Sequence, residues 1–292
     1  MLPDSEINAL IYLLDDSDKE VLNHVHSKLK SFGPSIIPSL ESAWTTDLNP
    51  LQHERLEEII HDIQFDSLTD EIKAWVETDE KNLLMGFYLI SKYHYPELNF
   101  EELQKKIFKI KQSIWLELNY NQTPLEQIQI FNQVLYKYHN FKGQQAAISF
   151  QEFCLNHVLE TKSGNVIAIG MLYQILANEL NLPVYGVPLP KYYVVCFCKK
   201  YIYDFTDISS TEKEVMFYIN PVNKGTVFSR NEIKDYLEKM QLEKKENYFA
   251  PTSNLSIIIE YISYLLDFYK SQNEPQKVQD LKQIRMFLLE NN

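Results

Sequence analysis

Several features are scarce in this chain of 292 residues, and their scarcity excludes whole classes of protein. It has 7 glycines, which disfavours the glycine-rich loops that bind phosphate, and no GxGxxG, Walker A, HExxH or nucleophile-elbow motif occurs. Its 3 cysteines cannot form a disulfide scaffold. No apolar run approaches the roughly 18 residues that span a bilayer, and the beginning, MLPDSEINAL, lacks the features of a signal peptide. We therefore expect a cytoplasmic protein that does not enter the membrane.

Positive charge is also scarce. The formal net charge is −12 and the isoelectric point is about 5.1, whereas nucleic-acid binding needs a positive surface. A basic run, Lys105-Lys106-Ile-Phe-Lys109-Ile-Lys111, alternates with apolar residues. In an acidic protein four such lysines indicate a solvated helix face, so we expect no nucleic-acid partner. Hydrophobic residues make up 45% of the chain, enough for a large core.

The first part of the chain, residues 1–120, has the periodicity of successive helices. Apolar residues in INALIYLLDD recur on one helical face, and Ser17-Asp-Lys-Glu20 predicts a capping box before the next helix. A short helix, a longer helix and Gly33-Pro34 follow the rhythm of a HEAT-type repeat. A looser second unit, of two helical pieces, is expected over 50–77. Residues 1–120 are therefore predicted to be a helical, HEAT-like region.

The pattern changes in residues 121–245. Thr123-Pro-Leu-Glu126 predicts a second capping box. Helices are expected near 126–143 and 149–161, and an almost wholly apolar, buried helix begins at Val166. The runs VYGVPL, YYVVCFC, YIYDF and EVMFYIN are typical of short antiparallel strands. Residues 246–292 are expected to form a helical hairpin of the tetratricopeptide type. The predicted fold class is α+β and predominantly helical.

Four segments of this middle region carry a family resemblance: IFNQVLYKYHNFKG, SFQEFCLNHVLETKSGN, VIAIGMLYQILANELNLPVYGVPLPKYYVV and FYINPVNKGTVFSRNEI. In order and spacing they resemble the papain-like core of transglutaminase-like proteins. The likeness is to a bacterial branch that joins this core to helical repeats. The resemblance implies a small antiparallel sheet packed on the buried helix.

The resemblance also implies a catalytic triad, and its positions are degenerate here. The nucleophile position falls at about Val166, the histidine position at Tyr192, and the third position at Asn220, with Asp204 as the alternative. Valine has no nucleophilic atom, and a phenol, which ordinarily ionises near pH 10, cannot replace imidazole near neutral pH. All 7 histidines lie at or before His157, so the predicted strands contain none. Tyr192 could line the remnant of a cleft or simply fill the space that an imidazole would leave.

The cysteines and His157 offer two further candidate sites, one for zinc and one for catalysis. Cys154 and His157, three apart on an expected helix, and Cys196 and Cys198, two apart on an expected strand, together offer three sulfur atoms and one imidazole for zinc. Cys154 with His157 could alternatively form a catalytic dyad. The composition favours a plainer interpretation, in which the cysteines are small hydrophobic residues of the core and no metal or other cofactor is bound.

The sequence therefore favours a non-catalytic protein, a protein- or peptide-binding scaffold whose partner it does not name. The alternative is an amide-bond hydrolase or acyltransferase of the transglutaminase or cysteine-protease type. That activity would require Cys154, His157 and Asp204 to converge in the fold.

Overall fold

The computed structural model describes residues 4–44, 48–79, 81–119, 121–190 and 192–292. The chain divides into two compact units, Met1–Ala74 and Trp75–Asn292. In the described residues no helix is both long and apolar enough to cross a membrane. The expected domains 1–120, 121–245 and 246–292 divide the chain differently and stay a prediction.

The described residues of the first unit form helices joined by short turns, with no strand among them. Its helices are α1 (Asp4–Tyr12), α2 (Lys19–Ser31), α3 (Ile37–Trp44) and α4 (Pro50–Val76), the last of which ends in the second unit. Of the expected apolar face, Ile7, Ile11 and Leu14 are buried in the core of this unit and Leu10 packs against it, whereas Leu13, in the 3₁₀ turn after α1, is 41% exposed. HEAT-like repeats stay a prediction.

Two local expectations for the first unit were wrong. The residue that caps α2 is Asp18 rather than Ser17, because the Asp18 carboxylate accepts a hydrogen bond from the backbone N–H of Glu20 at 2.8 Å. The segment 50–77, expected as two pieces, is the single 27-residue helix α4. No proline or glycine follows Pro50 within it, so nothing in the sequence interrupts the helix.

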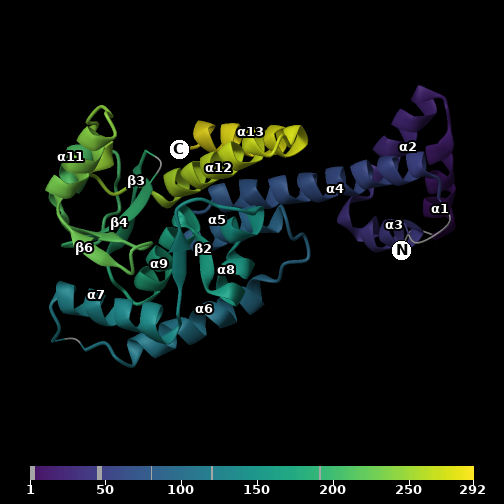
Figure 1. Ribbon diagram of the computed structural model, residues 1–292. Helices are drawn as coiled ribbons and strands as arrows, with labels where there is room; N and C mark the ends of the chain where they lie inside the picture. Colours follow the sequence, from purple (N-terminus) through teal and green to yellow (C-terminus); the bar gives the residue numbers. More distant parts are fainter. Residues whose placement is uncertain (1–3, 45–47, 80, 120, 191) are drawn as a thin grey trace. The chain divides into compact units, whose positions relative to one another are not determined.

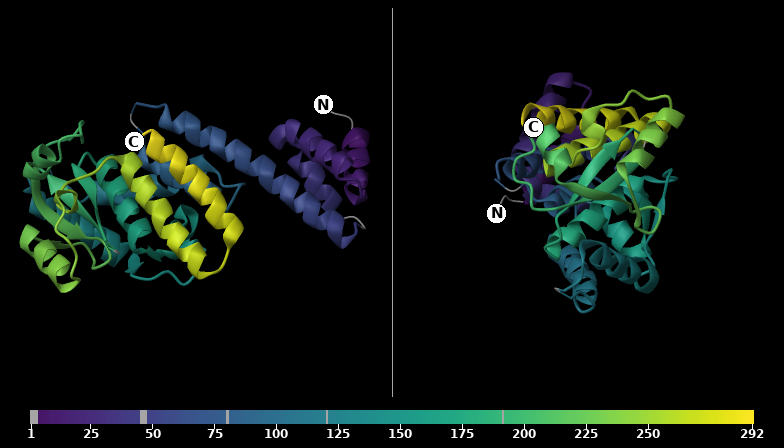
Figure 2. Two further views of the ribbon diagram at one scale, coloured as in Figure 1. Left: turned by 90° about the horizontal axis from the view of Figure 1, so that it is seen from above. Right: turned by 90° about the vertical axis from the view of Figure 1, so that its left-hand side faces the viewer.

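The second unit surrounds one buried helix, α9 (Val166–Glu179), twelve of whose fourteen residues are buried. Other helices of the unit, shown in Figures 1 and 2, surround α9 and the sheet. They are α5 (Leu83–Lys92), α6 (Phe100–Trp115), α7 (Pro124–Asn132), α8 (Leu155–Thr161), α10 (Ile208–Lys213), α11 (Arg230–Lys239), α12 (Asn254–Ser271) and α13 (Pro275–Glu290). The expected capping box is confirmed at the start of α7, where Thr123 and Glu126 bond reciprocally. A π-helical segment, Gln133–Tyr138, continues α7.

The main sheet is antiparallel and has the order β3-β4-β5-β6. Its strands are β3 (Val184–Leu189), β4 (Tyr192–Cys198), β5 (Val215–Asn220) and β6 (Thr226–Phe228). The expectation of a strand in YIYDF was wrong: residues 201–205 have no regular structure. There, Asp204 accepts hydrogen bonds from the backbone and hydroxyl of Thr206, a local turn that competes with strand pairing. A second, parallel pair joins β1 (Lys142–Gln144) to β2 (Ser163–Asn165).

The two faces of the main sheet have different coverings. The tyrosine ring of Tyr193 faces α9, because a Cβ atom added to Gly170 of that helix would lie 2.2 Å from it. The alternate residues of β4 belong to a cluster with α11, and they are Tyr192, Val194, Cys196 and Cys198. This arrangement follows from the alternation of side chains along a strand. It places Tyr192 and Tyr193 on opposite faces of the sheet.

The hairpin α12–α13 closes the unit, and its two helices lie side by side (Figures 1 and 2). Far-separated residues attach it to the rest of the unit. The hydroxyl of Tyr261 on α12 donates to the carbonyl of Phe153 at 2.8 Å, and the hydroxyl of Tyr93 donates to Asp280 on α13 at 2.7 Å. The expected C-terminal helical hairpin is thus present, while its tetratricopeptide character stays a prediction.

Candidate functional site

Val166 is the first residue of the buried helix α9, where the resemblance expects a nucleophile. The side chain of Asn165 caps the helix and accepts a hydrogen bond from the backbone N–H of Ala168 at 2.9 Å. The helix N-terminus would stabilise a thiolate at this position. Val166 has no ionisable atom and is 1% exposed, so the dipole acts on no reactive group there.

Tyr192 and Asn220, the expected second and third positions, lie in direct contact. The Asn220 side-chain amide donates a hydrogen bond to the Tyr192 hydroxyl at 2.8 Å. The amide oxygen of Asn220 accepts from the backbone N–H of Asn223 at 3.1 Å, which fixes the orientation of the group. The ring of Tyr192 also packs against Tyr236 of α11, with ring centres 5.9 Å apart. An asparagine thus orients a phenol here, in a geometry that could equally orient an imidazole.

Tyr193, rather than Tyr192, is the tyrosine of β4 that contacts the buried helix. Its hydroxyl donates to the Gln174 side chain at 3.4 Å, and Gln174 donates to Asn254 at 3.1 Å. Burial raises the pKa of Tyr193 well above the ordinary value, so the phenol stays neutral. The structure therefore brings two of the three expected positions together. It places Val166 in the helix on the other face of the sheet.

Asp204, the alternative third position, lies away from this pair. Tyr192 is the first residue of β4, whereas Asp204 lies six residues beyond the last residue, Cys198. Its neighbour Phe205 packs against Tyr185, which pairs with Cys196 near the far end of the strand. The carboxylate is exposed, and hydrogen bonds from the backbone and hydroxyl of Thr206 lower its pKa. Asp204 therefore stabilises the local turn with Thr206.

The turn between β5 and β6 is held by residues that the sequence did not identify. The side-chain amide of Asn132 donates to the carbonyl of Gly225 at 2.8 Å, and its oxygen accepts from Tyr173 of α9 at the same distance. Tyr136 donates to the carbonyl of Pro221 at 2.8 Å. The pairs Asn220-Pro221 and Lys224-Gly225 are typical of a turn, but nothing nearby in the sequence identifies the side chains that hold it.

Cys154 and His157 do not share a helix face. The expected helix 149–161 is divided into a 3₁₀ turn, Phe150–Phe153, and α8, and Cys154 lies between them in an extended conformation. Its thiol is buried and donates to the carbonyl of Phe150 at 3.5 Å. Burial raises the pKa of the Cys154 thiol, the opposite of what a catalytic cysteine needs.

Cys196 and Cys198 lie in the cluster beneath α11, with their sulfur atoms 3.8 Å apart. Burial is the main cause that raises the pKa of Cys196. Within the described ranges no group of three or more His, Cys, Asp or Glu side chains could hold a metal ion, so the four candidate zinc ligands do not converge. Cys154 and the pair Cys196 and Cys198 are therefore buried in separate places in the fold.

The burial of all three thiols predicts slow alkylation. In native buffer, iodoacetamide should modify Cys154, Cys196 and Cys198 at least about a hundredfold more slowly than in urea, because reaction requires both opening of the core and ionisation. Mass spectrometry of tryptic peptides over time measures each site separately. Fast labelling of Cys154 in the native protein would show that its thiol is exposed and acidic.

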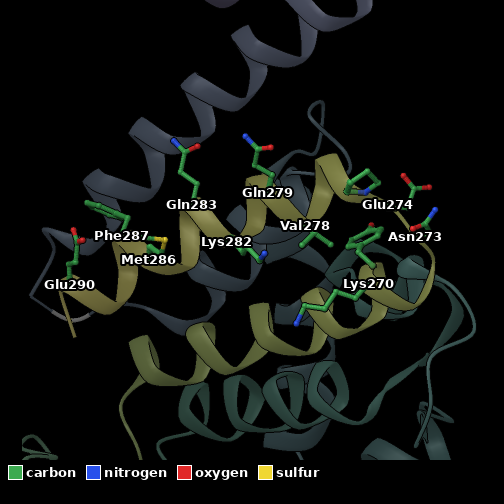
Figure 3. Close-up of a pocket in the computed structure, with 12 residues that line it drawn as sticks. Lys270, Asn273, Glu274, Val278, Gln279, Lys282, Gln283, Met286, Phe287 and Glu290 are labelled. Carbon is green, nitrogen blue, oxygen red and sulfur yellow. The ribbon is translucent and has the colours of Figure 1, made fainter.

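A groove of about 830 Å³ lies on the C-terminal hairpin. Figure 3 shows its lining side chains, most of them along α13, with Lys270 on α12. Lysine, glutamate and glutamine side chains alternate with Val278, Met286 and Phe287. Lys270 is paired with Asp267 at 3.2 Å. This mixed lining indicates no particular ligand.

Comparison with known proteins agrees with the fold. A sequence model described as the transglutaminase-like superfamily matches residues 101–262, from α6 to the middle of α12. No curated protein and no solved structure gives a match. Because the family match covers more than half of the 292 residues, the chain belongs to the transglutaminase-like superfamily.

Proposed function

We propose that this protein is a non-catalytic member of the superfamily that acts as a protein- or peptide-binding scaffold of a regulatory kind. The observation that carries the proposal is the hydrogen bond from Asn220 to the hydroxyl of Tyr192. An amide that would orient a catalytic imidazole is engaged with a phenol. Val166 at the start of α9 supplies no nucleophile.

The chemistry of such triads supports this proposal. A cysteine or serine triad needs a nucleophile and a base together, and loss of either lowers the rate by several orders of magnitude. At the positions carried over from the resemblance both are replaced. Helical segments on both sides of the family match supply surface for binding, and free, unpaired cysteines are compatible with a reducing cytoplasm.

The competing proposal is an amide-bond hydrolase or acyltransferase that uses Cys154, His157 and Asp204. It has less support, because Cys154 is buried with a raised pKa and Asp204 is bonded within its own loop. No cofactor is required by either proposal.

Enzyme assays with matched variants test the catalytic question. Purified protein is assayed with fluorogenic peptide amides and, for acyl transfer, with a glutamine donor protein and a dansylated amine. We expect rates at the buffer background for wild type, and the same rates for Cys154→Ser and Asp204→Asn. Turnover by wild type that disappears in Cys154→Ser would replace the scaffold proposal with the enzyme proposal.

Binding is tested separately, by chemical cross-linking of the tagged protein in native extract and reconstitution with each purified candidate. We expect at least one partner that re-forms a complex of micromolar or tighter affinity with the folded protein and not with the urea-unfolded one. Failure of every reconstitution would contradict a scaffold.

A further inference from the structure

The outward side of α6 carries exposed aromatic side chains and lysines. The inward side of this helix is buried in the core through Leu103, Ile107, Ile110 and Ile114. At 100° per residue, the residues that project on the opposite side are Glu101, Lys105, Phe108, Lys109 and Gln112, with Trp115 at its border, and these six are called the α6 outer face. Figure 1 shows α6 along the lower border of its unit.

Two large aromatic side chains lie on this face. Phe108 is 58% exposed and Trp115 is 59% exposed. They are seven residues apart, two helical turns, so about 10 Å separates them along the axis. Leu116, the next residue, is also exposed. Single exposed apolar residues are common, but aromatic residues grouped on one face are typical of the centres of protein interfaces.

Lysines lie beside the aromatic residues. Of the four lysines in the basic run, Lys106 pairs with Glu160 at 3.0 Å and Lys111 pairs with Glu179 at 2.9 Å. Lys105 and Lys109 are exposed and form no ion pair with any residue that the structure describes. Glu101, in the first turn, also lies on this face, one turn before Lys105. The face thus has two aromatic side chains and, beside them, two lysines and one glutamate, so positive charge exceeds negative charge on it.

We infer that the α6 outer face binds an acidic amphipathic helix of a partner protein. The partner would place two apolar side chains on Phe108 and Trp115 and carboxylates next to Lys105 and Lys109. This inference rests on the proposed binding function, and it names the surface and the chemistry of the partner.

The charge distribution favours a short acidic protein segment over other anionic partners. The whole chain has a net charge of −12. A nucleic acid or an anionic membrane presents an extended array of charge, which the whole protein repels. The few carboxylates of a helix, held within one Debye length of about 8 Å, interact mainly with the two lysines. Helix-in-groove and helix-on-helix recognition uses apolar anchors at this two-turn spacing.

A peptide selection on the whole chain tests the inference. The probe is a display library of random peptides of about 16 residues, roughly four helical turns. We expect enrichment of peptides that combine apolar residues two turns apart with Asp or Glu. Synthetic copies, measured by fluorescence anisotropy, should bind Phe108→Ala/Trp115→Ala at least about thirtyfold more weakly than wild type, because aromatic anchors dominate interface energy.

Charge reversal provides the sharper variant. Lys105→Glu/Lys109→Glu should weaken the acidic peptides about tenfold, and a new selection on this variant should enrich basic peptides instead. Tyr203→Ala and Met286→Ala are matched controls, since both residues are exposed elsewhere in the same unit, and each should change affinity less than about twofold. Emission of Trp115 should shift to shorter wavelength on binding and should be quenched by acrylamide in the free protein.

The outcomes separate this inference from the proposed function. Peptides that bind equally well to the α6 variants would keep the binding function and overturn the α6 assignment. Trp115 already shielded from acrylamide in the free protein would overturn it too. Binding of phosphatidylserine vesicles or of single-stranded DNA through the same residues, without peptide binding, would overturn the protein partner. Enrichment of no peptide, with no reconstituted complex, would overturn both.

Discussion

Replacement of Gly186 by alanine is expected to lower the free energy of unfolding by about 3 kcal/mol or more, a large fraction of the stability of a typical domain. A Cβ atom on Gly186 would lie 1.9 Å from the hydroxyl oxygen of Tyr193 and 2.8 Å from a methyl group of Ile257. Both neighbours are buried, so neither can turn aside without disturbing the core. The measurement is equilibrium unfolding in urea, followed by far-UV circular dichroism.

The same geometry predicts which second substitution restores stability. Tyr193→Phe removes the oxygen atom that meets the new methyl group, and by itself costs about 1 kcal/mol through the lost bond to Gln174. The double variant Gly186→Ala/Tyr193→Phe should therefore be more stable than the sum of the single effects predicts, by about 1 kcal/mol or more. Rescue stays partial, since the Cβ would still lie 2.8 Å from the ring.

Gly170 supplies the matched control. A Cβ atom there would meet ring carbons of Tyr193, at 2.2 and 2.6 Å, which phenylalanine retains. Gly170→Ala should thus be about as destabilising as Gly186→Ala, and Tyr193→Phe should not rescue it. Equal rescue of both glycine variants, or of neither, would contradict the position of the Tyr193 hydroxyl against β3.

These glycines show how much of the candidate site the sequence could predict. Alternation along PLPKYYVV predicts that Tyr192 and Tyr193 face opposite sides of the sheet. The pattern does not tell which of the two faces α9. That is decided by the absence of side chains at Gly170 and Gly186, on two other elements, which leaves room for one ring. Scarce glycines in otherwise apolar segments were the signal of this close approach.

Local patterns succeeded where the chemistry is local. The capping box of Thr123 and Glu126 and the start of α9 after Asn165 depend on residues within one turn. The cap of α2 was misplaced by one residue because Ser17 and Asp18 are both good caps, and either is compatible with the pattern. Which of the two residues caps the helix depends on the backbone conformation of the segment that precedes α2. The sequence pattern does not specify that conformation.

Polar contacts between residues far apart in the chain could not be predicted from the sequence, for a different reason. The ring of His94, in the turn that follows α5, is enclosed by Tyr93, Phe150 and Tyr269, with ring centres 4.8, 4.9 and 5.7 Å away. The hydroxyl of Tyr269 lies 3.2 Å from Nδ1 of His94, although the two residues are 175 positions apart. Nothing in the periodicity of either helix indicates this pairing, which only the docking of the α12–α13 hairpin creates.

His94 leads to the second large expected effect, on stability as a function of pH. Burial, with a smaller contribution from Lys277, lowers the pKa of His94 to about 3. In the unfolded chain a histidine has a pKa near 6.5. Below that pH the unfolded state therefore binds a proton that the folded state does not bind until the pH approaches 3. Stability is therefore full above about pH 6.5 and is lost as the pH falls toward 3. Between pH 7 and pH 5 the loss should be about 2 kcal/mol.

The variant His94→Gln isolates this contribution. Glutamine keeps a hydrogen-bonding group near Tyr269 and does not titrate, so its stability should fall less than that of wild type between pH 7 and pH 5, by the same 2 kcal/mol or so. Other groups contribute as well: burial raises the pKa of Glu260, for example, which acts in the opposite direction. The difference between the two proteins at each pH cancels such shared contributions. Urea unfolding of both proteins at several pH values measures it, and parallel pH profiles would mean that His94 accepts its proton without leaving the folded state.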